Sequence, residues 1–266
     1  MSLLWSFVRR DAAIAASYRT GFILPLASIF ATVPVIYFLA QVFSGSSGVS
    51  LGAYQGNYFA FLLLGLALQD YVSLSTSTFL TGIREHQLMG TLEIVMLSPT
   101  PVSKILIYSS AWGYLFTSLR FALYVLLGLA LGLDLSHANL WSFALLTLAA
   151  IVCFAAIGVI GAAVTLLVKQ GTAVTTFLTT HTLAFGGVAY PIDIMPNWLQ
   201  HLAWLMPFTH ALSGAREALL LGASPLDLAA ELGTLVAYGV VLTPVALICF
   251  HAALRRARAH GTLAQY

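Results

Sequence analysis

Charged residues are scarce in this chain, making up only 8% of its 266 residues. Soluble proteins contain about 25% charged residues, so a water-soluble fold of this length could not cover its surface. Hydrophobic residues make up 60% of the chain, and the mean hydropathy is +0.93. We therefore interpret the sequence as an integral membrane protein. The net charge of +2 is too small to indicate a nucleic-acid partner.

Cysteines are few, and motifs for metal or phosphate binding are missing. Cys153 and Cys249 both fall in apolar runs, whereas a disulfide framework or metal site would need more cysteines at closer spacing. No His-x-x-x-His or Glu-x-x-His pair occurs, so we expect no metal site. No Gly-x-x-x-x-Gly-Lys-Ser/Thr loop occurs, so we expect no ATPase site in this chain. No set of catalytic residues can be placed at one membrane depth, and we predict none.

Six apolar runs are long enough to cross a bilayer, for which a helix needs about 20 apolar residues. We predict spanning helices over 21–43, 57–80, 105–133, 140–168, 172–190 and 228–250. Residues 2–19 predict an amphipathic helix at the membrane interface, because Leu3, Phe7 and Ile14 share one face at helical spacing. A frayed cytoplasmic tail is the alternative there. The whole chain, 1–266, is predicted to form one all-α transmembrane domain.

The basic residues predict the orientation of the chain in the membrane. If there are six spans, nine of the eleven Lys and Arg residues lie on one side: Arg9, Arg10, Arg19, Arg84, Lys104, Lys169, Arg255, Arg256 and Arg258. Basic loops are typically cytoplasmic. We therefore predict that both termini are cytoplasmic, in a bacterial inner membrane. Arg120 and Arg216 are not assigned by this pattern.

A polar segment over 82–104 separates the second predicted span from the third. It contains four of the few charged residues in the chain: Arg84, Glu85, Glu93 and Lys104. The segment is long enough for a short helix of its own, with Leu88 and Leu92 on an apolar face. We predict that it docks a soluble partner. A solvated loop helix without a partner is the alternative.

Prolines interrupt the segment over 191–224, ahead of the last predicted span. Pro191, Pro196 and Pro207 divide it into apolar pieces that are too short to cross a bilayer. Trp198 lies where an aromatic side chain would meet the outer interface. We predict two short helices that dip into the outer leaflet as a re-entrant hairpin, because each would satisfy its own backbone groups there.

Two charges, Asp70 and Arg120, fall inside predicted spans, where a charge costs about 2.5–3.5 kcal/mol on insertion scales. We predict that they pair, either to fix two helices together or as part of a substrate path. Aromatic residues are frequent in the outer halves of the first, second and fifth spans, and packing against lipid or helices is the alternative to a substrate conduit. The predicted pathway residues are Tyr37, Phe38, Tyr58, Asp70, Arg120, His181, Phe185 and Tyr190.

Two segments resemble those of a known family. The run with Arg84-Glu85, Gly90-Thr91-Leu92-Glu93 and Ser98-Pro99 is similar to the first cytoplasmic loop of ABC-2-type ABC exporter permeases. The run with Tyr190-Pro191, Pro196-Asn197-Trp198 and Met206-Pro207 resembles that family's outer re-entrant hairpin. The resemblance covers nearly the whole chain. The very short outer loops favour the compact branch, which includes polysaccharide, lipooligosaccharide and drug exporters.

The resemblance implies a coupling helix within 82–104 that contacts a separate ATP-binding-cassette subunit. The coupling residues would be Arg84, Glu85, Leu88, Thr91, Leu92 and Glu93. It also implies two copies of this chain, two copies of the nucleotide-binding subunit, and ATP and Mg bound there, with no cofactor in this chain. The cargo would be a lipid-linked glycan, a lipid or a drug, moved outward. A secondary transporter and a membrane-embedded enzyme remain the alternatives.

Overall fold

The computed structural model describes residues 3–44, 58–88, 102–168, 176 and 180–259. Every regular element in these residues is helical, which confirms the predicted all-α fold. Among them, five helices are long and apolar enough to cross a membrane: Arg19–Phe43, Tyr58–Phe79, Ser110–Ala130, Leu140–Leu166 and Ala229–Ala257. The number of six spans stays a prediction, because residues 172–175 and 177–179 of the predicted fifth span lie outside the described residues.

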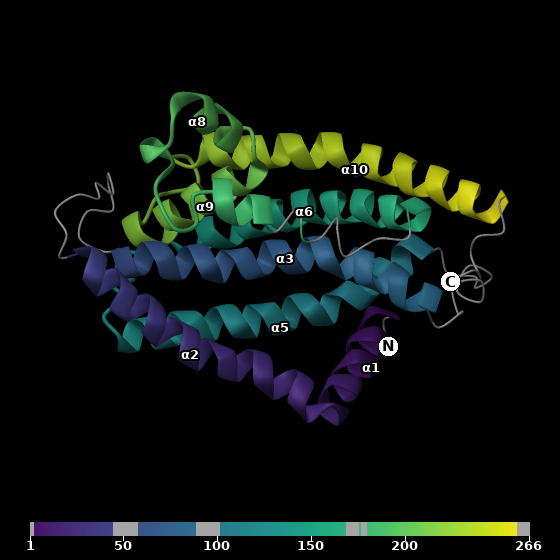
Figure 1. Ribbon diagram of the computed structural model, residues 1–266, viewed down its shortest axis with the longest axis horizontal. Coiled ribbons are helices and arrows are strands. Elements are labelled where there is room, and N and C mark those ends of the chain that lie inside the picture. Colours follow the sequence, from purple (N-terminus) through teal and green to yellow (C-terminus); the bar gives the residue numbers. More distant parts are fainter. Residues whose placement is uncertain (1–2, 45–57, 89–101, 169–175, 177–179, 260–266) are drawn as a thin grey trace.

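The chain begins with two helices that meet at a sharp elbow (Figure 1). Helix α1 covers Leu3–Ser17 and helix α2 covers Arg19–Ser44. The first confirms that the predicted N-terminal segment is helical, while its place at a membrane interface stays a prediction. Pro25 and Pro34 lie inside α2, where each removes a backbone donor. The Ser28 hydroxyl donates to the Pro25 carbonyl at 2.8 Å.

The next two helices differ from their predicted limits. The candidate span Tyr58–Phe79 agrees with the predicted 57–80, but helix α3 itself runs from Tyr58 to Leu88, eight residues beyond the predicted end. The residues after Leu80 include good helix formers and no proline, and they extend the helix into the polar segment. Helix α5 covers Val102–Ala130 and ends before the predicted 133. Gly132 has φ +98°, and the Leu133 N–H donates to the Gly128 carbonyl at 2.8 Å, which caps the helix.

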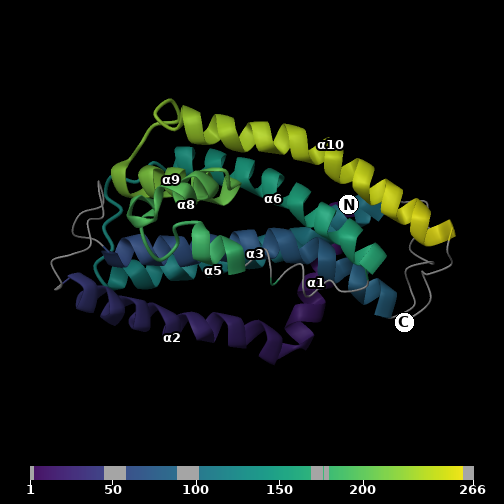
Figure 2. The same ribbon diagram turned by 45° about the horizontal axis from the view of Figure 1, so that its top comes forward.

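The long helices pack around α3, the most buried of the five. Helix α6 covers Leu140–Val168, as predicted, and α10 covers Ala229–Ala259, nine residues beyond the predicted end at 250. Figures 1 and 2 show α6 and α10 on one side of α3, and α5 and α2 on the other. Separate apolar cores lie between α3 and the α2–α5 side and between α3 and the α6–α10 side.

The proline-rich segment forms short helices, as predicted. They are a 3-10 turn η2 (Ile192–Ile194), α8 (Asn197–Trp204), α9 (Pro207–Arg216) and a π-helical turn η3 (Glu217–Leu221). Pro191 and Pro196 are the N-caps of η2 and α8, and Pro207 is the first residue of α9. Proline suits such positions, since the first helical N–H groups have no partner within the helix. Whether these helices enter the bilayer stays a prediction.

The two ends of the bundle carry different elements (Figure 1). Helix α1, the end of α3, the start of α5 and the end of α10 gather at one end, and α8 lies toward the other. The basic residues that these elements carry, among them Arg10, Lys104 and Arg255, therefore lie toward the same end of the bundle. This agrees with a one-sided distribution of positive charge, while the side of the membrane stays a prediction.

Candidate functional site

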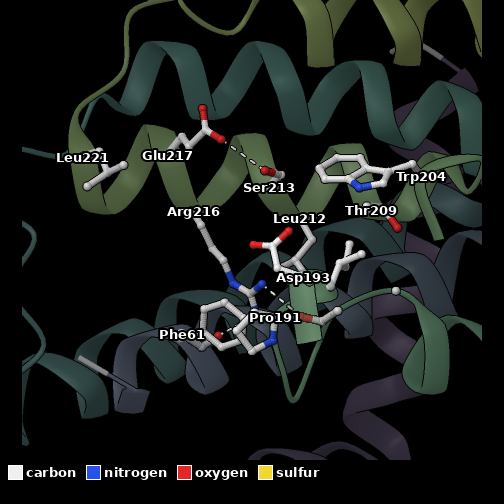
Figure 3. Close-up of a pocket in the computed structure, with 13 residues that line it drawn as sticks. Phe61, Pro191, Asp193, Trp204, Thr209, Leu212, Ser213, Arg216, Glu217 and Leu221 are labelled. Atoms are coloured by element: carbon white, nitrogen blue, oxygen red, sulfur yellow. Dashed lines mark hydrogen bonds between the residues drawn. The ribbon is translucent and has the colours of Figure 1, made fainter. Parts of the chain in front are cut away.

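A buried arginine joins three distant parts of the chain. Arg216, at the end of α9, is only 4% exposed. Its Nη1 donates to the Gly187 carbonyl at 3.0 Å, and its Nη2 donates to the carbonyls of Phe61 and Val188 at 2.9 and 3.0 Å. The guanidinium carbon lies 3.3 Å from the centroid of the Phe61 ring, which is a cation–π geometry. Figure 3 shows the side chain extending from α9 to Phe61.

Glycines allow the close packing around this arginine. The helical backbone over 180–185 ends at Gly186, and Gly187 has φ +74°, a conformation that favours glycine. A Cβ atom on Gly186 would overlap the Phe208 ring. On α3, a Cβ atom on Gly65 would lie 2.8 Å from the Val188 carbonyl oxygen and 2.9 Å from the Arg216 Nη2 atom. The helix therefore ends where the guanidinium can donate to the carbonyls that the break leaves without a helical partner.

The same helix break forms one wall of a cavity of about 310 Å³. Besides Arg216, its polar lining includes Asp193 of η2, Trp204 of α8, and Ser213 and Glu217 at the junction of α9 and η3 (Figure 3). The Ser213 hydroxyl donates to Glu217 Oε1 at 3.1 Å. Burial raises the pKa of the Glu217 carboxyl, the Ser213 hydrogen bond lowers it, and the neighbouring Glu231 carboxylate raises it.

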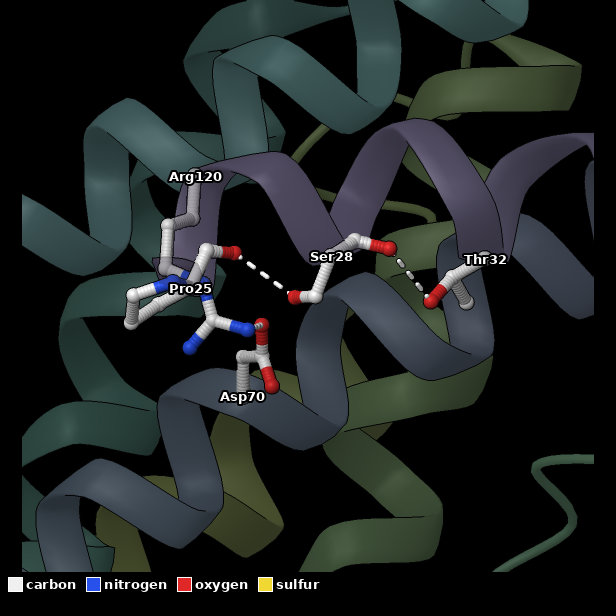
Figure 4. Close-up of polar contacts among 5 residues, drawn as sticks. All are labelled: Pro25, Ser28, Thr32, Asp70 and Arg120. Carbon is white, nitrogen blue, oxygen red and sulfur yellow. Dashed lines mark hydrogen bonds and ion pairs between the residues drawn. The ribbon is translucent and has the colours of Figure 1, made fainter. Parts of the chain in front are cut away.

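A second polar centre lies between α3 and α5. Arg120 Nη2 is 2.8 Å from Asp70 Oδ2, which confirms the predicted pairing of these residues (Figure 4). Both side chains are 23% exposed in the single chain. Charges facing acyl chains are costly, so a partly exposed pair in a membrane span is expected to face a water-filled cavity or another protein.

Hydroxyl groups extend this polar contact along the two helices. The Tyr71 and Ser118 hydroxyls are hydrogen-bonded at 2.6 Å, and the Tyr114 hydroxyl donates to Ser75 Oγ at 3.0 Å. Each pair links α3 to α5. Helix α2, which packs on both, adds the exposed Ser28 beside Pro25 (Figure 4). We call the groups on α3 and α5, together with the ion pair, the polar seam.

A comparison with known protein families assigns the chain. Residues 3–220 match the sequence profile of the ABC-2 type transporter, which is most of the chain. The chain belongs to the ABC-2 type transporter family. No curated protein matches it significantly. The chain is thus a transport permease with an ABC-2 membrane domain, and the family implies a membrane setting and an ABC ATPase partner.

The predicted aromatic pathway residues of this ABC-2 permease have separate local contacts. The Tyr37 ring lies 5.4 Å from that of Phe59, and Phe38 is 65% exposed. The Tyr58 hydroxyl donates to the Ala189 carbonyl at 2.8 Å, and the Tyr190 hydroxyl donates to the Ala184 carbonyl.

The remaining predicted pathway residues are His181 and Phe185 of the fifth segment. Their rings lie 5.8 Å apart. The helix ends after Phe185, so the predicted continuation of this span to Tyr190 is wrong. Tyr58 lies 12 residues from Asp70 on α3, about 18 Å along the axis. The Asp70–Arg120 ion pair is therefore separate from Tyr58, and the structure does not bring the predicted pathway residues together as one site.

The predicted coupling residues lie at the edge of the described chain. Arg84, Glu85 and Leu88 belong to the last turns of α3. Thr91, Leu92 and Glu93 lie outside the described residues. The structure therefore places only the first residues of the polar segment over 82–104. They lie at the end of the bundle that also holds the start of α5 (Figure 1).

The residue that the sequence interpretation missed is Arg216. The one-sided pattern of basic residues does not include it, and no site was predicted for it. Two signals could have identified it. It lies in a short apolar helix, and it follows a Gly-Gly pair at the end of an apolar run. An arginine in such surroundings needs acceptors, and a broken helix end provides carbonyls.

Proposed function

We propose that this ABC-2 permease is the membrane-spanning subunit of an ATP-driven exporter, working as two copies with two copies of an ABC ATPase. The observation that carries this is the family match over residues 3–220. The partner would bind ATP and Mg and supply the energy. This chain would contribute the path across the membrane and carry out no bond chemistry.

The positions of the end of α3 and the start of α5 support a docking surface for the ATPase. The polar segment leaves α3 after Leu88 and returns at Val102, at the end of the bundle where basic residues gather. Cytoplasmic loops are typically rich in Lys and Arg. We propose that the segment over 82–104 makes the coupling contact, with Arg84 and Glu85 at the end of α3 and Glu93 after it in sequence as the polar groups.

The polar seam indicates which face of the chain could line the substrate path. Its ion pair is partly exposed in the single chain, and hydroxyl groups continue along the same two helices. We propose that this face lines the path between the two copies, where water or cargo covers the charges. The cargo would be an amphiphile, namely a lipid-linked glycan, a lipid or a drug.

The test is reconstitution of the permease with its ABC ATPase in sealed vesicles. The expected result is movement of a fluorescent amphiphile that requires ATP and stops when vanadate inhibits the ATPase. Movement at the same rate without the ATPase, driven by an ion gradient, would instead identify a secondary transporter.

Coupling is tested by reversing charge at Glu85 and Glu93. We expect the double variant Glu85→Lys, Glu93→Lys to fold and to lose the stimulation of ATP hydrolysis by cargo. Asp134→Lys is the matched control, because Asp134 is exposed and lies in the loop at the opposite end of α5. Unchanged stimulation in the double variant would refute the coupling assignment.

A further inference from the structure

A groove lies inside the elbow between α1 and α2, where α5 passes close to both. Figures 1 and 2 show the two helices diverging from this elbow. The groove has a volume of about 270 Å³ and is lined by Ile14, Ala15, Tyr18, Gly21, Phe22, Trp112 and Phe116. The only side-chain polar atoms among these residues are the Tyr18 hydroxyl and the Trp112 indole nitrogen. None of the residues belongs to the polar seam or to the Arg216 cavity.

The position of the groove matches the boundary between lipid headgroups and acyl chains. It lies at the first turn of α2, the start of a candidate membrane span that begins at Arg19. Tyr18 is 72% exposed, and Trp112 is half-buried. Tyrosine and tryptophan are typical of this depth, because their rings are apolar and their polar atoms reach the headgroups.

The size of the groove fits one hydrocarbon chain. Sites that enclose drug-sized ligands have volumes of about 300–1,000 Å³, so this groove is smaller than most of them. Its aromatic wall, formed by Phe22 and Phe116 with rings 5.2 Å apart, offers only apolar contacts. Gly21 widens it, because a Cβ atom built there meets no atom within 4 Å.

Charge at the mouth of the groove selects the headgroup. Arg19 is exposed and stands between Tyr18 and Gly21 in sequence. Lys104, also exposed, lies on α5 eight residues before Trp112, which is about 12 Å along the helix axis. Arg10 is already paired with Asp11 at 2.7 Å. Basic residues beside a membrane attract anionic lipids.

We propose that this elbow groove binds one acyl chain of an anionic phospholipid from the surrounding leaflet, with the phosphate against Arg19. The bound lipid fastens α1 to the start of α2 and to α5. This inference requires only that α2 spans the membrane, so it does not depend on the cargo or on the ATPase.

The test counts lipids bound to the full chain. The protein is purified from vesicles of phosphatidylglycerol and phosphatidylcholine, and retained lipids are counted by native mass spectrometry. Gly21→Leu places a side chain in the groove, and we expect it to lose one retained phosphatidylglycerol. Gly233→Leu is the matched control, because Gly233 also has no atom within 4 Å of a Cβ and lies on α10.

A second measurement tests whether the groove distinguishes between lipid headgroups. A variant with Trp112 as its only tryptophan is placed in bilayers containing a brominated lipid, which quenches nearby indoles. We expect stronger quenching by brominated phosphatidylglycerol than by brominated phosphatidylcholine. Arg19→Gln should lower this preference about fivefold, the ratio that corresponds to about 1 kcal/mol per basic residue.

Three results would overturn the proposal. The first is equal lipid retention by Gly21→Leu and Gly233→Leu. The second is equal quenching of Trp112 by the two brominated lipids in the otherwise unaltered protein. The third is a change in oligomeric state of Gly21→Leu without loss of lipid, which would assign the groove to contacts between copies of the chain.

Discussion

Replacing Arg216 tests whether the guanidinium holds α9 against α3. Arg216→Ala removes three hydrogen bonds and the stacking on Phe61 at once. A hydrogen bond to a charged group contributes about 1.5–3 kcal/mol, and a desolvated cation–π contact contributes about 2 kcal/mol. Dehydrating the guanidinium offsets part of this sum. We expect a net loss of about 3–5 kcal/mol, because the carbonyls also lose their charged donor.

The assay is reversible unfolding in mixed micelles with increasing dodecyl sulfate. Arg216→Lys keeps the charge, but a lysine cannot stack flat on a ring or present a planar fork of donors. We therefore expect it to recover less than half of the loss. Phe61→Leu, combined with each Arg216 variant, isolates the stacking contact, with an expected coupling energy of about 0.5–2 kcal/mol.

The reasoning would be refuted in either of two ways. A loss below about 1 kcal/mol in Arg216→Ala would mean that the three hydrogen bonds carry no net stability, contrary to their expected magnitude. Full recovery by Arg216→Lys would mean that the planar geometry is irrelevant and that a positive charge alone suffices.

The remaining predictions concern neighbouring contacts. Gly65→Ala should destabilise by about 1–3 kcal/mol through overpacking against a backbone oxygen, whereas Gly233→Ala should be neutral or stabilising in the same unfolding assay; equal effects would exclude the close approach. Asp70→Asn and Arg120→Gln should each destabilise and show a coupling of about 0.5–3 kcal/mol in the double variant, and strict additivity would count against the pair. The raised folded-state pKa of Glu217 means that the folded state holds its proton more tightly, so stability falls as pH rises from 4.5, the ordinary pKa, through the raised value. Glu217→Gln should remove this part of the pH dependence and raise stability at neutral pH, and an unchanged profile would refute it.

Composition and the length of the apolar runs predicted the fold because a helix that crosses a bilayer must be apolar over about 20 residues. The limits of α6 are those predicted, since its apolar run is bounded by a polar loop and by Lys169-Gln170-Gly171. The apolar span of α3 ends near the predicted 80, whereas the helix continues to Leu88 because helix propensity persists after hydropathy falls. Apolarity indicates what can enter a membrane, and backbone preference decides where a helix ends.

The candidate site was only partly predictable, for a similar reason. The Asp70–Arg120 pair could be predicted because each charge is isolated in an apolar span and needs the other. The contacts of Arg216 could not, because its acceptors are backbone carbonyls, which every residue carries and no sequence pattern marks. Among the glycines, only Gly65 marks the space that the guanidinium occupies, because a Cβ atom there would lie 2.9 Å from the Arg216 Nη2 atom.

The Arg216 contacts also have a consequence for how the protein is made. The bond to the Phe61 carbonyl joins residues that are 155 positions apart, and the bond to Gly187 joins residues 29 apart. During synthesis, α3 and the helix break are therefore complete long before the arginine that joins them leaves the ribosome. Until then, water or an insertion factor must satisfy the carbonyls of Gly187 and Val188. The contact between α9 and α3 therefore forms late, and a chain truncated before residue 216 would leave the carbonyls of the helix break without the guanidinium.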